Sequence, residues 1–405
     1  MDYSIGFGGA TKSTGLTLRH MPDVQPVILT SQQKHIRDLW YGSLPTYVFR
    51  TTVNYRTRSL IDEWMRGHKV PMALQRFVRR GLAIIDAVVE QANALRVWQI
   101  IRRHGIQIVQ LNNGPMPREA VLGARLARVP AIVYLRGFFH QDTGWRRNIS
   151  DSSWVIGDSR AVTQSYTSSF PTPLPNTTIY ETVDVAAFDR ISHMRSDIRT
   201  QWGIVDDDIA VGLFGRIVDW KGQREFVLAM LDALAHEPRL KVCLVGDSSD
   251  GSTAYQDEVF ALIRASAMKE RFVLTGYVSQ VEPLNVAMDI VVHASIVPEP
   301  CGMVILEGMA ARRPVIAMAE GGPPELVVDG VTGLLVPPRN VPALTEAVLA
   351  LSKDAGRRQQ MGERGYARMK SEFDVPVIAE QFRQVYGDLL HRVRDEAKHP
   401  PRLPT

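Results

Sequence analysis

The chain of 405 residues is long enough for two or three domains, and its 45% hydrophobic and 22% charged residues are typical of a globular protein with a large core. Its two cysteines, Cys243 and Cys301, are too few for a disulfide framework or a cysteine-rich zinc site. No run reaches the roughly 18 uninterrupted apolar residues of a membrane span, and the first residues lack a signal-peptide pattern. We therefore expect a cytoplasmic protein with reduced thiols.

The net charge of +4 is unevenly distributed along the chain. Residues 1–190 contain 23 Lys and Arg against 14 Asp and Glu, a net charge of +9, and the remainder carries −5. A basic domain suggests a nucleic acid, an anionic membrane or a phosphorylated substrate as its partner. Because no nucleic-acid-binding motif accompanies the basic residues, we expect no nucleic-acid partner.

The chain opens on a glycine-rich turn, residues 4–13, which leads into a helical stretch. Gly8 and Gly9 would let the backbone approach a ligand closely, although their spacing is not that of a dinucleotide-binding loop. The alternative is a flexible start.

Residues 73–104 predict a long helix, because apolar residues recur there at helical spacing. Arg76, Arg79 and Arg80 crowd one end of it, and Arg102 and Arg103 the other. Such a stripe is usually a core-facing side with a solvated opposite face. The functional alternative is a patch that binds an anionic membrane surface.

Four apolar segments, residues 106–111, 131–135, 154–156 and 178–180, alternate with helical stretches. This alternation predicts a parallel sheet covered on both faces, in which ligands bind outside the carboxyl ends of the strands. Asn112, Asn113, Arg136 and His140 follow strand ends, so we expect them to face a cleft. Each could equally be an ordinary surface residue.

The second half contains a candidate anion site after the apolar segment 209–214. Arg216 and Lys221 follow this strand and precede a helix, and two cations beside a helix start favour an anion. The acidic run 206–208 precedes the same strand, at the end opposite to the ligands of a parallel sheet, so we reject it as a metal site.

A second ligand site is predicted where the strand 290–294 leads to a helix that starts near Gly302. Glu299 lies just past the strand, and the amides of Met303 and Val304 would be exposed at the helix start, where they favour a phosphate. Glu307 lies about 7.5 Å along the helix axis from Gly302 at roughly 1.5 Å per residue, about the span of a diphosphate. The two carboxylates could thus hold the hydroxyls of a sugar and of a ribose.

The block from residue 298 to 336 resembles the donor-binding region of the retaining glycosyltransferases of family 4, which have the GT-B fold and a Glu-x7-Glu signature. The resemblance implies that Glu299 lies at the donor sugar, that Glu307 binds the ribose, and that the amides of residues 302–304 approach the sugar and phosphates. One departure is Cys301, which replaces an aromatic residue at a packing position.

The same resemblance assigns roles elsewhere in the chain. Arg216 and Lys221 would bind the donor diphosphate, and Gly276 and Tyr277 would neighbour the nucleotide base. Gly8 and Gly9 match a glycine pair near the donor phosphates. Many family members have a histidine where this chain has Arg136, which leaves open whether Arg136 or His140 contacts the donor sugar.

The expected fold is therefore α/β, of the GT-B type, with two Rossmann-like, doubly wound parallel-sheet domains facing a central cleft. Residues 1–190 would form the acceptor-facing domain and residues 191–374 the donor-binding domain. A helix over 375–395 is expected to pack back on the first domain, and the proline-rich residues 396–405 to be disordered.

The expected function is metal-independent, retaining transfer of a sugar from a nucleoside-diphosphate sugar to a carbohydrate or lipid-linked acceptor, without a cofactor. Assembly of a cell-surface polysaccharide or glycolipid at the inner face of the membrane would suit the basic first domain. The alternatives are a nucleotide-sugar epimerase of the same fold and a non-catalytic nucleotide-sugar binding protein. Arg216 and Lys221, together with Glu299 and Glu307, favour transfer.

One expected element of this fold is missing from the sequence. Family members begin with an apolar strand, but only residues 1–7 precede Gly8, and they are too few and too polar for a buried parallel strand. We expect either a start codon placed too late or a first domain that is marginally stable as written.

Overall fold

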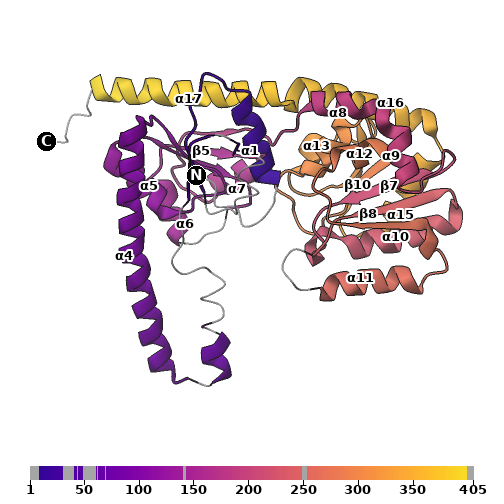
Figure 1. Cartoon of the computed structure of the whole chain (residues 1–405), viewed down its shortest axis with the longest axis horizontal. Coiled ribbons are helices and arrows are strands. Elements are labelled where there is room, and N and C mark those ends of the chain that lie inside the picture. Colours follow the sequence, from indigo (N-terminus) through magenta and orange to yellow (C-terminus); the bar gives the residue numbers. More distant parts are fainter. Residues whose placement is uncertain are drawn as a thin grey trace. The chain divides into compact units, whose positions relative to one another are not determined.

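A computed structural model describes residues 9–30, 41–42, 44–48, 61, 63–68, 70–139, 143–248 and 253–398. The chain divides into two compact units, which are considered one at a time (Figure 1). The first takes its residues from 1–157, 165–178 and 381–405, and the second from 158–164 and 179–380. The described parts of both have the expected α/β architecture of parallel strands and covering helices.

The first unit contains a four-stranded parallel sheet in the order β3-β4-β5-β6. Its strands are β3 (Val109–Leu111), β4 (Ala131–Leu135), β5 (Trp154–Gly157) and β6 (Asn176–Thr178). Its helices are α1 (Gly9–Arg19), α4 (Met72–His104), α5 (Arg118–Ala127), α6 (Thr143–Ser150) and α7 (Arg160–Thr167), the last of which begins in the second unit. The strand expected over 178–180 instead ends at Thr178, because its partner β5 ends at Gly157, which pairs with Thr178.

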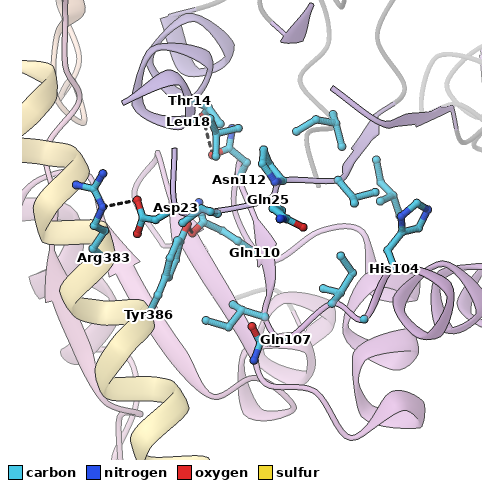
Figure 2. Close-up of a pocket in the computed structure, with 18 of the residues that line it drawn as sticks. Thr14, Leu18, Asp23, Gln25, His104, Gln107, Gln110, Asn112, Arg383 and Tyr386 are labelled. Carbon is cyan, nitrogen blue, oxygen red and sulfur yellow. Dashed lines mark hydrogen bonds and ion pairs between the residues drawn. The ribbon is translucent and has the colours of Figure 1, made fainter. Parts of the chain in front are cut away.

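A separate two-stranded parallel sheet joins β1 (Ile28–Thr30) to β2 (Thr46–Val48). Leu29 nevertheless packs in the same hydrophobic cluster as Val109 and Leu111 of β3. A cavity of about 660 Å³ is lined by residues of β1, of β3, of α1 and of the last helix (Figure 2). The expectation about an opening strand concerns residues 1–7, which lie outside the described residues.

The last helix, α17 (Val375–Lys398), contributes its residues from 381 onward to the first unit. Arg383 Nε lies 2.9 Å from Asp23 Oδ1, and the Tyr386 hydroxyl donates to Gln110 Oε1 over 2.8 Å (Figure 2). Phe382 meets the ring of Tyr134 edge to face. Thus this helix packs on β3, β4 and the segment after α1, and it runs three residues past the expected end at 395.

The second unit is built on a six-stranded parallel sheet in the order β12-β11-β10-β7-β8-β9. The strands are β7 (Ile209–Phe214), β8 (Leu240–Val245), β9 (Phe272–Gly276), β10 (Ile290–His293), β11 (Val315–Met318) and β12 (Gly333–Val336). The helices are α8 (Val185–Ile191), α9 (Arg195–Gln201), α10 (Gln223–His236), α11 (Ala254–Ala265), α12 (Glu282–Ala287), α13 (Met303–Ala310), α14 (Pro323–Leu326), α15 (Val341–Ser352) and α16 (Ala355–Arg368). Short 3-10 turns occur at Ser192–Met194, Asp219–Lys221 and Lys269–Arg271, and a π-helical turn, Met369–Phe373, follows α16.

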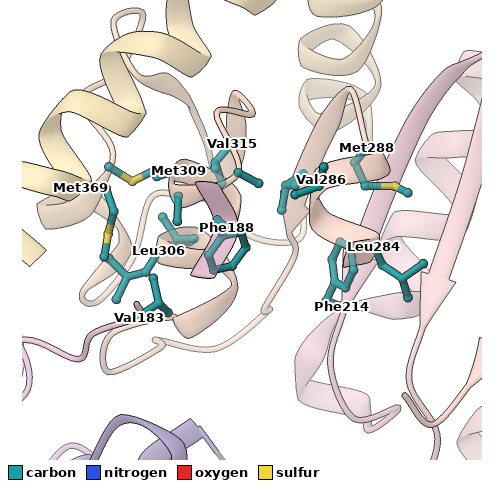
Figure 3. Close-up of a cluster of buried hydrophobic side chains, with 14 of the residues drawn as sticks. Val183, Phe188, Phe214, Leu284, Val286, Met288, Leu306, Met309, Val315 and Met369 are labelled. Carbon is teal, nitrogen blue, oxygen red and sulfur yellow. The ribbon is translucent and has the colours of Figure 1, made fainter. Parts of the chain in front are cut away.

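Successive side chains of these strands point to opposite faces of the sheet, and each face has its own core. In β10, Val291 joins the cluster formed with α8, α12 and α13 (Figure 3), whereas Ile290 and Val292 join the cluster formed with α10, α11 and α15. The central strands are therefore buried on both sides, which explains why they read as continuous apolar runs. Cys243 and Cys301 both belong to the first of these clusters, and both thiols are free.

Candidate functional site

The strand order of the second unit fixes where a ligand can bind. From β7 the chain moves outward to β8 and β9, and from β10 it moves to the other side, to β11 and β12. The loops after β7 and β10 therefore diverge, and in open parallel sheets ligands bind in the crevice at this switch point. These two loops, residues 215–222 and 294–302, contain Arg216, Lys221 and Glu299.

The two loops pack against each other over a short distance. The amide of Ile296 donates to the carbonyl of Trp220 over 2.9 Å. Gly222 has a positive φ of 71°, and a Cβ built there would collide with the carbonyl oxygen of Ala294. Only glycine allows this approach, so Gly222 determines how closely Lys221 lies to the loop after β10.

Lys221 and Glu299 form a close ion pair at this place. The Lys221 ammonium lies 2.9 Å from Oε1 and 2.8 Å from Oε2 of Glu299. It also lies 4.3 Å from the centre of the Trp220 ring, within the range of a cation–π contact. The side chains of Lys221 and Glu299 are 22% and 12% exposed, so the pair is largely removed from water.

Two further side chains hold the Glu299 carboxylate. The hydroxyl of Ser295 donates to Oε2 over 2.6 Å, and Nε2 of His293, at the end of β10, lies 3.4 Å from the same oxygen. Burial by itself would raise the pKa of Glu299, but the Lys221 ammonium and the His293 ring outweigh it and hold that pKa well below its usual value. Glu299 is therefore a carboxylate at neutral pH.

The backbone of Glu299 is fixed by the loop after β11. The amide of Gly322 donates to the carbonyl of Glu299 over 2.8 Å. Gly321 has a φ of 79°, and a Cβ at this residue would collide with the Glu299 carbonyl oxygen. The Gly-Gly pair thus permits the close contact that orients the Glu299 loop.

Helix α13 starts directly after this loop. Gly302 is its N-cap with a φ of 106°, and the amides of Met303 and Val304 lie in its first turn, where they lack carbonyl partners within the helix. Glu307 lies in the same helix and is buried, 6% exposed. The structure therefore places Gly302, Met303, Val304 and Glu307 on the element that follows Glu299.

The other residues expected at the donor also follow strands of this sheet. Arg216 comes directly after β7 and is exposed, and its carbonyl accepts from Gln223 Nε2 over 2.7 Å. Gly276 ends β9 with a φ of 65°, and its carbonyl accepts from the amide of Gly246 over 3.0 Å. Tyr277 follows with an exposed ring.

In the first unit, the structure brings together two of the four expected contact residues. The Thr14 hydroxyl, on α1, donates to Asn112 Oδ1 over 2.8 Å and accepts from Arg136 Nη2 over 3.0 Å. Asn112 is buried, and its Nδ2 has no hydrogen-bond partner in the described part of the chain. Asn113 is exposed. Gly9 opens α1, whereas Gly8 and His140 lie outside the described residues.

Sequence reasoning missed His293, Ser295 and Thr14. His293 and Ser295 are polar residues at the end of an apolar strand, four to six positions before Glu299, and both are buried in the structure. A buried polar residue at a carboxyl strand end is the signal that could have identified them. Thr14 has no such signal, because its partners are 98 and 122 positions away.

Within the described residues, no group of three or more His, Cys, Asp or Glu side chains could hold a metal ion. Asp208, from the acidic run 206–208, pairs with Arg271 at 2.6 Å and accepts from the amide of Val205 at 3.0 Å. It lies at the amino end of β7, away from Lys221. It therefore stabilises the loop before β7.

We expect Gly222→Ala to lower the thermal midpoint of the protein and to weaken anion binding at the site. The added Cβ requires a positive φ and must displace Ala294, and such backbone strain costs about 1–3 kcal/mol. Gly42→Ala is the matched control, since Gly42 also has a positive φ but no atom within 4 Å of its Cβ position. An equal loss of stability in both variants would show that the approach of the two loops is not the cause.

Comparisons with known proteins give a family match for the second unit. Residues 194–368 match the family "Glycosyl transferases group 1". The alpha-D-kanosaminyltransferase of Streptomyces kanamyceticus is 27% identical over 48% of this chain and 49% of its own length. The lipopolysaccharide core biosynthesis mannosyltransferase LpcC of Rhizobium leguminosarum bv. viciae is 28% identical over 60% of this chain and 69% of its own length. The chain thus spans about half the length of the first relative.

Solved structures show the same fold over nearly the whole chain. A complex of Anabaena Alr3699/HepE with UDP and glucose has a TM-score of 0.75 at 23% identity, covering 95% of this chain and 98% of that one. A glycosyltransferase from Rickettsia africae has a TM-score of 0.79 at 17% identity, covering 96% and 97%. Residues 194–368 thus match the glycosyltransferase group 1 family, and the chain has the GT-B fold.

Proposed function

We propose that this protein is a retaining glycosyltransferase that moves a sugar from a nucleoside-diphosphate sugar to a hydroxyl of a carbohydrate or lipid-linked acceptor. The observation that carries the proposal is the meeting of Lys221 and Glu299 at the switch point of the second sheet, directly before the start of α13. A cation, a carboxylate and helix amides converge there at the place where such sheets bind ligands.

Each group has a distinct role in this proposal. Lys221, Arg216 and the amides of Met303 and Val304 would bind the diphosphate, while Glu299 would face the donor sugar and Glu307 the ribose. The bond between the anomeric carbon and the diphosphate oxygen breaks, and the diphosphate leaves with the electron pair. The acceptor hydroxyl gives its proton to the departing diphosphate oxygen and forms the new bond to the same carbon, on the face that the diphosphate left.

The negative charge that develops on the diphosphate is the main electrostatic demand of this reaction. Positive groups fixed in advance around developing charge are usually the largest catalytic contribution. Glu299 holds Lys221 in place, and Ser295 fixes the Glu299 carboxylate. Lys221 and Glu299 lie on loops that make close backbone contacts. With cations supplied by the chain, the proposed transfer needs neither a divalent ion nor a cofactor.

We expect nucleoside diphosphates to raise the thermal midpoint in the presence of EDTA. A ligand at 100 times its Kd adds about 2.7 kcal/mol to the apparent stability. UDP, which is bound in the Anabaena structure, is the first nucleotide to test, followed by the other nucleoside diphosphates. Stabilisation that appears only with added Mg²⁺ or Mn²⁺ would contradict the metal-independent site.

Analysis of the reaction products distinguishes a glycosyltransferase from an epimerase and from a binding protein. An epimerase of the same fold would convert the nucleotide sugar without an acceptor, and a binding protein would leave it unchanged. A mass increase of the acceptor by one sugar, with the anomeric configuration of the donor preserved, is the result expected here. Inversion at the anomeric carbon would overturn the retaining assignment while leaving transfer intact.

The acceptor and the cellular place complete the proposal. One relative is named as a mannosyltransferase of lipopolysaccharide core biosynthesis, which supports a role in assembling a cell-surface polysaccharide or glycolipid. None of the described helices is long and apolar enough to cross a membrane. The proposed place of action is the cytoplasmic face of the membrane, where lipid-linked acceptors are reached from one side.

A further inference from the structure

The longest described helix of the first unit carries an apolar stripe that no other described part of the chain buries. Besides Met72 at its first position, six large apolar side chains of α4 are more than half exposed: Leu74, Phe77, Ile84, Ile85, Val88 and Leu95. Phe77 is 74% exposed, Ile84 66% and Val88 63%. Exposed apolar patches of this extent on a soluble protein mark an interaction surface. We propose that this stripe of α4 inserts into the interface of an anionic lipid membrane.

The six side chains lie on one face of the helix. Phe77, Ile84, Val88 and Leu95 follow one another at intervals of seven, four and seven residues, which returns nearly to the same side of an α-helix. Leu74 and Ile85 lie next to this line. At 1.5 Å per residue the stripe is roughly 30 Å long, the shape expected of a helix that lies in the plane of a membrane interface.

The position of α4 leaves the stripe accessible. Its buried residues, Asn93, Ala94, Val97 and Ile101, all lie in the C-terminal part of the helix, where it packs on α5. Gly123 of α5 allows this contact, because a Cβ there would collide with Val97. From Met72 to residue 92 the helix has no buried side chain, and in Figure 1 this part extends away from the sheet of the first unit.

The charges on α4 decide between a membrane and a second copy of the chain. The helix carries six arginines against Asp86 and Glu90, and Glu90 lies 3.3 Å from Arg118 of α5. Two such helices side by side would each bring a net charge of +4, six arginines less two acids, to the shared interface. An anionic surface instead attracts them, and Arg76, Arg79 and Arg80 are all exposed beside Phe77. Their long stems can pack along the apolar stripe while the guanidinium groups reach lipid phosphates.

The test is flotation of the full chain with two kinds of vesicle, phosphatidylcholine alone and phosphatidylcholine mixed with phosphatidylglycerol. We expect recovery with the anionic vesicles only. The variant Phe77→Asp with Ile84→Asp removes two apolar contacts and should lower partitioning roughly 10- to 100-fold. Neutralising Arg76, Arg79 and Arg80 to Gln should also abolish the preference for anionic vesicles.

Two control variants match these changes. Leu126→Asp introduces an acid at another exposed leucine of the first unit, on α5. Neutralising Lys269, Lys353 and Arg364, three exposed cations of the second unit, removes the same charge elsewhere. Both controls should float like the wild type. Equal recovery with neutral and anionic vesicles, or equal losses in test and control variants, would overturn the proposal.

A second copy as occupant would give a different result. The wild type would be dimeric by light scattering without lipid, Phe77→Asp with Ile84→Asp would be monomeric, and vesicles would recruit neither. The inference goes beyond the transfer reaction and can fail independently of it. Stabilisation by UDP reports on the second unit and should be the same in the stripe variant and the wild type, so its loss would indicate misfolding.

Discussion

Arg216→Ala and Lys221→Ala are each expected to lower the rate of glycosyl transfer by about 10²–10³, because each removes one positive group from the departing diphosphate. The loss should appear mainly in kcat, because the additional negative charge on the departing diphosphate develops beside these groups only in the transition state. Arg216 is exposed at the end of β7, so its removal leaves the packing unchanged. Turnover with a defined donor and acceptor, measured beside the thermal midpoint, tests both variants.

A matched control is available on the next helix. Arg224→Ala removes an exposed cation of α10 that pairs with Glu258 at 3.1 Å and does not contact Glu299. It should leave turnover within a factor of a few of the wild type. Full activity in Arg216→Ala or Lys221→Ala, or a loss in Arg224→Ala as large as theirs, would contradict the assignment of the diphosphate site.

The second unit could be predicted closely from the sequence because its strands are buried on both faces. Residues 209–214 were predicted as a strand and form β7, and the segment 290–294 forms β10 with one residue fewer. Such strands are continuous apolar runs that end at polar loops. The switch point follows from their order, so the loops with Arg216, Lys221 and Glu299 were placed correctly at carboxyl strand ends.

The partners of the side chains could not be predicted, since they depend on tertiary contacts. Lys221 and Glu299 are 78 positions apart, and the two residues were expected to contact different parts of the donor. In the structure each neutralises the other. The hydrogen bonds of Thr14 to Asn112 and Arg136 could not be predicted either, because they too join residues far apart in the sequence.

The long helix shows a different limit of sequence reasoning. The apolar stripe over residues 73–104 predicts a core-facing side, and from Asn93 to Ile101 this is correct. Between residues 72 and 92 the stripe faces solvent. Periodicity reports that a face is apolar, but only the packing of the remaining chain decides whether protein covers it.

Breaking the ion pair between Lys221 and Glu299 is expected to lower the stability of the protein, which is the second large effect. Lys221→Met leaves the Glu299 carboxylate largely buried with Ser295 and His293 beside it but without the ammonium, and removing one partner of a buried pair costs about 3–5 kcal/mol. Because Lys221 is 22% exposed, we expect the lower part of this range. Glu299→Gln should cost less, since the ammonium can turn toward water and the Trp220 ring.

The double variant Lys221→Met with Glu299→Gln separates stability from catalysis. It contains no buried charge at this place, so it should be more stable than Lys221→Met alone and yet inactive in transfer. A loss of stability in the double variant equal to the sum of the losses in the two single variants would show that the pair does not act as a unit. Each loss is measured as a shift of the thermal midpoint.

The contribution of Glu299 to stability should change with pH in opposite directions in the wild type and in Lys221→Met. In the wild type the folded pKa of Glu299 is lowered, so the pair stabilises the protein above the unfolded pKa of about 4.3, and this contribution is lost as the pH falls through the folded value. In Lys221→Met, burial remains and the ammonium is gone, so we expect the folded pKa to rise above the unfolded one. The penalty in this variant should therefore shrink as the pH falls from 7 toward about 4.3, because protonation removes the buried charge. A penalty for Lys221→Met that is independent of pH would mean that the carboxylate finds water or another cation when the lysine is absent.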